Sequence, residues 1–137
     1  MRLLVCASAR EFRSVREALD CSVQLSFATG FDEALALARA GTDRILCGAQ
    51  FDESRMLDLL AALKADARTR SIPCLCVRAI AVTPESSPAD TAVACQALGA
   101  VFIDLEGWRQ QWGRRNAAER LQTVIRQPYG QVPGKTD

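Results

Sequence analysis

The sequence contains no histidine, which removes several kinds of chemistry at once. Catalytic triads built on imidazole and metal sites with histidine ligands both need that side chain. The sequence also lacks a long apolar run, since none approaches the roughly 20 residues that a membrane-spanning helix requires. Hydrolases of the triad type and membrane-spanning proteins are therefore poor candidates.

The sequence also has no excess of positive or negative charge. The chain of 137 residues has 17 basic and 16 acidic residues, a formal net charge of +1 and no run of like charges. Nucleic-acid binders usually show a basic stripe or patch, so nucleic acid is not an expected partner. The length suits one compact domain with one core, which we place at residues 1–127. Residues 128–137 have no core pattern and are expected to form a tail or the start of a linker.

Disulfides of the kind found in secreted proteins are not expected either, although the chain has six cysteines. Cys6, Cys47, Cys74 and Cys76 lie inside apolar runs, which favours reduced, buried thiols over disulfides. A metal or redox cluster of these four is the alternative, but structural zinc usually uses turn-borne Cys-x-x-Cys spacing. The apolar start, residues 3–6, is too short for a signal peptide, so we expect a cytoplasmic protein.

Hydrophobic periodicity predicts an α/β fold. Continuous apolar runs of the kind buried in parallel sheets occur at Leu3 to Cys6, Ile45 to Cys47, Cys74 to Val77 and Val101 to Leu105. The segment from Val23 to Phe27 alternates instead, which is typical of an edge strand. Helical patterns lie between the strands, so right-handed crossovers give a doubly wound five-stranded parallel sheet.

Local signals predict where some helices begin and end. Ser8 and Glu11 have the spacing of a capping box, and Gly41 is placed to end the second helix. Asn116 is expected to begin the last helix, which Pro128 would stop.

Several motifs occur in a fixed order along the chain. They are Thr29 to Leu35, Asp43 to Gly48, Leu57 to Leu60, Lys64 to Pro73, and Leu98 to Ala100. In this order they resemble response-regulator receiver domains (CheY-like) over residues 2–107. The resemblance implies the strand order 2-1-3-4-5 and a flavodoxin-like three-layer sandwich.

The residues on which receiver chemistry depends are absent. As the resemblance implies, an active receiver has two acidic residues after strand one, an acceptor Asp after strand three, a hydroxyl after strand four and a Lys after strand five. The matching positions here hold Ala7 and Ser8, Gly48, Arg78 and Glu106. Mg²⁺ ligands, nucleophile and counter-charge are all missing. The nearest acids, Asp52 and Glu53, fit a solvated helix entry better than a metal site.

We therefore interpret the chain as a pseudo-receiver: a non-enzymatic, phosphorylation-independent interaction module of a two-component-type system, without a metal or cofactor. The resemblance implies a protein partner, such as a histidine kinase or another regulator, or self-association. The expected face is that of the family's helix four, strand five and helix five, with Ile80, Val82, Trp108 and Trp112 as candidate contacts.

An alternative function stays open at this point. The positions of Ala7 and Gly48 would leave room in the crevice at the strand ends, and Arg78 could hold an anion there, which would make the chain a small-ligand or anion sensor. Under the pseudo-receiver interpretation, Arg78 and Glu106 would instead form an ion pair across the ends of strands four and five.

Overall fold

Five parallel strands form a single sheet. The computed structural model describes residues 1–80 and 88–127. The strands are β1 (Arg2–Cys6), β2 (Gln24–Ala28), β3 (Arg44–Gly48), β4 (Cys74–Val77) and β5 (Val101–Ile103). Their order in the sheet is β2-β1-β3-β4-β5. The predicted doubly wound, flavodoxin-like fold and its strand order are confirmed.

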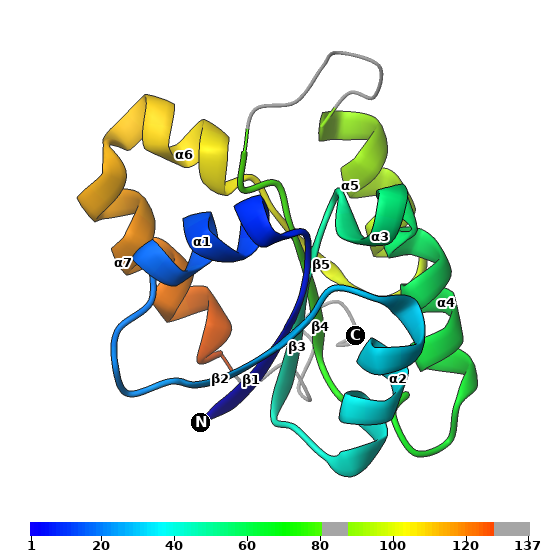
Figure 1. The fold of residues 1–137 in the computed structure, drawn as a ribbon. Coiled ribbons are helices and arrows are strands. Elements are labelled where there is room, and N and C mark those ends of the chain that lie inside the picture. Colours follow the sequence, from blue (N-terminus) through cyan, green and yellow to red (C-terminus); the bar gives the residue numbers. More distant parts are fainter. Residues whose placement is uncertain (81–87, 128–137) are drawn as a thin grey trace.

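Helices cover both faces of the sheet, as Figure 1 shows. One face carries α1 (Ala9–Glu17), α6 (Leu105–Trp112) and α7 (Arg114–Ile125). The other carries α2 (Phe31–Ala40), α3 (Phe51–Ser54), α4 (Met56–Ala65) and α5 (Pro88–Ala97). The result is a three-layer sandwich with one apolar layer on each side of the sheet.

Successive residues of the central strands point into opposite layers. In β1, Leu3 and Val5 pack toward α1 and α7, whereas Leu4 and Cys6 pack toward α2 and α4. All four are buried, and burying a leucine or valine side chain is worth about 1.5–3 kcal/mol. Burial on both faces explains the continuous apolar runs and fixes the strand ends where the candidate site lies.

The alternating segment is the edge strand, as predicted. β2 lies at the end of the sheet order, beside β1, and its burial alternates along Gln24–Ala28. Phe27 stacks on Phe12 of α1, with 4.1 Å between the ring centroids.

The buried cysteines behave as small apolar residues. Cys6, Cys47, Cys74 and Cys76 are free and buried in the layer beneath α2, α4 and α5. A hydrogen bond to Cys6 and burial raise the pKa of the Cys47 thiol, and burial raises the pKa of Cys74 to about 12. Both thiols are protonated and unreactive at neutral pH.

Two features of the C-terminal third differ from the sequence prediction. Leu105 was assigned to the fifth strand, but β5 ends at Ile103 and Leu105 is the first residue of α6. The last helix begins at Arg114 rather than Asn116, because Gly113, with a φ of 87°, interrupts the helical conformation between α6 and α7. Asn116 lies inside α7, where its amide donates to the Trp112 carbonyl at 3.0 Å. Gly41, with a φ of 110°, ends α2 as predicted.

Within the described ranges, no helix has the length and apolar character needed to cross a bilayer.

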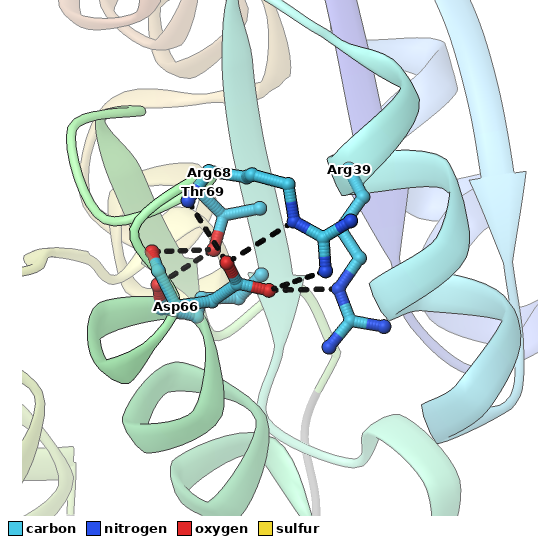
Figure 2. A network of polar contacts seen from close by, with 5 residues as sticks. Arg39, Asp66, Arg68 and Thr69 are labelled. Atoms are coloured by element: carbon cyan, nitrogen blue, oxygen red, sulfur yellow. Dashed lines mark hydrogen bonds and ion pairs between the residues drawn. The ribbon is translucent and has the colours of Figure 1, made fainter.

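A polar network ties α2 to the turn after α4 (Figure 2). Asp66 accepts hydrogen bonds from the Arg68 amide at 2.8 Å and from Arg39 Nε at 2.7 Å. The Thr69 hydroxyl donates to the Leu63 carbonyl at 2.7 Å, which closes the turn. The Arg68 amide, followed by the Arg39 guanidinium, lowers the pKa of Asp66 from 3.8 to about 2.

This lowered pKa predicts acid sensitivity. A carboxyl whose pKa is depressed in the folded state contributes stability above its unfolded pKa, and that stability is lost as the pH falls through the folded value. The urea midpoint should therefore fall between about pH 4 and pH 2 more steeply for the wild type than for Asp66→Asn. Parallel pH profiles for the two proteins would contradict the assignment.

Candidate functional site at the strand ends

The carboxyl ends of the central strands meet at one edge of the sheet, where open α/β folds place their binding crevice. Cys6 pairs in register with Cys47 and Cys47 with Cys76, so Ala7, Gly48 and Arg78 follow or end neighbouring strands. The structure thus brings these predicted positions together.

Glu11 extends into this edge from the first turn of α1. Its Oε1 accepts the Ser8 amide at 2.9 Å and its Oε2 accepts the Gln50 amide at 2.8 Å. The Glu11 amide donates to the Ser8 hydroxyl at 3.2 Å, so the predicted capping box is confirmed. Only 1% of Glu11 is exposed. One buried carboxylate therefore joins the loop after β1 to the loop after β3.

The same carboxylate occupies the space that a side chain at position 48 would need. A Cβ on Gly48 would lie 2.5 Å from Glu11 Cδ and Oε1, and 2.6 Å from Oε2. Gly48 is not one of the glycines with positive φ, so the requirement for glycine is steric and not conformational. The space beside Gly48 is thus filled by a carboxylate from elsewhere in the chain.

This role of Glu11 was not predicted from the sequence. The spacing of Ser8 and Glu11 indicated the capping box, but the second hydrogen bond links residues far apart in sequence. The available signal was the combination of a capping-box glutamate after one strand with a glycine at the end of the next strand in the sheet.

The predicted ion pair between Arg78 and Glu106 is wrong, because Arg78 pairs with Asp104. Arg78 Nη1 lies 2.7 Å from Asp104 Oδ1, with side chains 23% and 31% exposed. Asp104 directly follows β5 and is the N-cap of α6, where it also accepts the Gly107 amide at 3.0 Å. Glu106 lies further along, in the first turn of α6. Its amide donates to the Arg78 carbonyl at 2.9 Å, and its carboxylate accepts Gln110 Nε2 at 3.0 Å.

Replacing Asp104 should therefore matter more than replacing Glu106. Asp104→Ala removes a helix cap and a half-buried ion pair, and should lower the free energy of unfolding by about 1–3 kcal/mol. Glu106→Ala removes only an exposed bond and should cost less than about 0.5 kcal/mol. Chemical denaturation of both variants measures the difference, and equal costs would contradict the assignment of the pair.

The residues at this edge do not fit a Mg²⁺ site of the receiver kind. Ala7 and Gly48 carry no side-chain oxygen, and each Glu11 oxygen already accepts a backbone amide. In residues 1–80 and 88–127, no group of three or more Cys, Asp or Glu side chains is placed to hold a metal ion. Asp52 instead accepts the Phe31 amide at 3.0 Å and so caps α2. The side chain of Glu53 lies outside the part of the chain that the structure describes.

The alternative of a ligand in this crevice loses the two features on which it was based. The space beside Gly48 is taken by the Glu11 carboxylate, and the charge of Arg78 is paired with Asp104.

The candidate interaction residues fall in two places. Trp108 and Trp112 lie on α6 with ring centroids 6.0 Å apart, and Trp112 is 39% exposed. The Arg120 guanidinium of α7 lies over both rings, at 5.2 Å and 5.1 Å from their centroids. Ile80 is half-buried at the start of the connection after β4, and Val82 lies outside the described residues.

Known structures share this fold. The chemotaxis response regulator CheY4 of Vibrio cholerae is 20% identical with a TM-score of 0.63, over 90% of this chain and 97% of that chain. A response regulator from Hahella chejuensis is 17% identical with a TM-score of 0.66, over 99% and 98%. The phosphorylated cyanobacterial phytochrome response regulator RcpA is 14% identical with a TM-score of 0.68, over 91% and 94%.

No protein-family model matches the sequence, and no curated protein does so at a significant level. At identities of 20% and below, the structural similarity defines the fold, which is the CheY-like fold of receiver domains.

Proposed function

We propose that the chain is a phosphorylation-independent, receiver-like module that acts through protein contacts in a two-component-type regulatory system. The observation that carries this proposal is the Glu11 carboxylate, which accepts the Ser8 and Gln50 amides and fills the space beside Gly48. A side chain at position 48 has no room there, and Gly48 itself offers no nucleophile.

The charged groups at the strand ends also support a site whose arrangement does not depend on phosphorylation. In receiver chemistry, a new phosphoryl charge draws side chains toward the ends of the strands, as the resemblance implies. Here a carboxylate is already in place, and Arg78 is paired with Asp104 at the base of α6. A site whose carboxylate and guanidinium are both held by bonds from within the chain has no need of a transferred phosphoryl group.

The partner would be a protein, such as a histidine kinase or another regulator, or a second copy of this chain. The exposed part of Trp112, beside Trp108 and Arg120, provides an aromatic and cationic surface of the kind enriched in protein interfaces. In this proposal the chain is not an enzyme and works in the cytoplasm.

Phosphorylation independence is tested by incubating the protein with acetyl phosphate and Mg²⁺ and measuring its intact mass. We expect no gain of a phosphoryl group, because the nucleophile and the metal ligands are both missing. A receiver that has an acceptor aspartate, treated in parallel, should gain one and shows that the reagent is active. A stable phosphoryl group on any residue from 7 to 53 would overturn the proposal.

A further inference from the structure

A pocket of about 380 Å³ lies beside the strand ends, between α1, α6 and the start of the connection after β4. It is separate from the crevice, because its lining includes neither Gly48 nor Arg78. Four arginines line it, together with two glutamates, Ser14 and the residues that follow Arg78. The arginines are Arg10, Arg13, Arg109 and Arg114.

Arg109 is held in place by neutral oxygen atoms. Its Nη1 donates to the Ser14 hydroxyl and, at 3.4 Å, to the Ala79 carbonyl, while Nη2 donates to the Ser14 carbonyl at 2.7 Å. Among the residues that the structure describes, no carboxylate lies within ion-pair distance of Arg109. The guanidinium is therefore ordered and half-buried while its charge has no direct counter-ion.

The remaining charges leave the pocket positive. Of the two glutamates, Glu17 pairs with Arg114 at 3.0 Å and Glu106 accepts Gln110. Arg10 and Arg13 lie three residues apart and so on one side of α1, and no partner for either side chain occurs within the described part of the chain.

The pKa of Arg109 agrees with a positive charge that the surrounding carboxylates do not fully balance. Burial and the nearby Arg114 lower the pKa of Arg109, and Glu17 and Glu106 counter this only in part. An anion in the pocket would supply the missing negative charge.

We propose that this pocket binds a small ligand carrying a phosphate-type group, with Arg109 fixed at one wall and Arg10 and Arg13 supplied by α1. Guanidinium groups match the geometry of phosphate oxygens and bind them with paired hydrogen bonds. The volume lies in the range of small-molecule sites, so free phosphate, pyrophosphate or a nucleotide are all of suitable size. Because α6 carries Arg109 as well as Trp108 and Trp112, the ligand would contact the same helix as the candidate interaction surface.

Titration calorimetry at low salt and without Mg²⁺ tests this site, with inorganic phosphate, pyrophosphate and ADP as separate probes. We expect saturable binding of at least one probe, weakened about tenfold by Arg13→Gln. Arg16→Gln is the matched control, since it removes the same charge from an exposed position of the same helix outside the pocket, and should change the affinity less than about twofold. Binding of ADP alone would identify a nucleotide as the source of the phosphate, and binding of phosphate or pyrophosphate would identify the free anion.

Three results would overturn the proposal. One is the absence of binding by the wild type up to about 10 mM of every probe. Another is an equal loss of affinity in Arg13→Gln and Arg16→Gln, which would indicate general attraction to a basic helix. The third is loss of binding in Arg78→Gln but not in Arg13→Gln, which would place the anion in the crevice at the strand ends.

Discussion

Gly48→Ala should lower the free energy of unfolding by about 2–4 kcal/mol, although alanine is normally tolerated well in this backbone conformation. The added Cβ would stand 2.5 Å from the Glu11 carboxylate, which cannot swing aside without leaving its bonds to the Ser8 and Gln50 amides. Each charge-assisted bond is worth about 1.5–3 kcal/mol. Urea unfolding of the wild type and the variant measures the cost.

A double-mutant cycle shows whether the steric explanation is correct. In a Glu11→Ala background the three atoms that would lie nearest to a Cβ at position 48 are gone. Gly48→Ala should then cost less than about 1 kcal/mol or stabilise slightly, since alanine restricts the unfolded chain. A cost that is the same in both backgrounds would mean that Glu11 is not what requires glycine at position 48.

Glu11→Ala should itself be among the most destabilising substitutions outside the apolar core, at about 2–4 kcal/mol. It leaves the amides of Ser8 and Gln50 without their acceptors in a part-buried site and removes one half of the capping box. Glu11→Gln should fall between the wild type and alanine, because the amide group retains one oxygen but turns a second donor toward a backbone N–H.

Glu33→Ala is the matched control for Glu11→Ala. Glu33 lies in the first turn of α2 and accepts the Thr29 amide at 3.3 Å, but it is exposed. Its loss should cost less than about 1 kcal/mol, since water replaces the bond. If the two alanine variants lost similar stability, the bridge to Gln50 would contribute nothing beyond an ordinary helix start.

Most of the fold could be predicted because its signals are local. Four apolar runs located β1, β3, β4 and β5, the alternation from Val23 to Phe27 located the edge strand β2, and Gly41 marked the end of a helix. The boundary at Asp104 was missed because the apolar run continues into Leu105, which is buried in α6 rather than in a strand. The sequence shows that Leu105 is apolar but not which element buries it.

The site was harder to predict because its bonds are not local. The glycine at the end of β3 was visible in the sequence, whereas the hydrogen bond from Gln50 to Glu11 depends on β1 and β3 being neighbours. The choice of Asp104 over Glu106 as the partner of Arg78 likewise follows from where β5 ends. Residue identity therefore indicated which side chains stand at the strand ends, but not which groups they bond to.

The hydrogen bonds that Glu11 makes at the strand ends differ from a phosphoryl group in how long they last. A phosphoryl group on an aspartate has a lifetime and can be removed by another protein, so it reports a recent event. The Glu11 carboxylate is attached to its own backbone and is made whenever the chain is synthesised. Under the proposed function, the strength of such a signal would follow the amount of protein in the cell, and it would end by degradation or dilution.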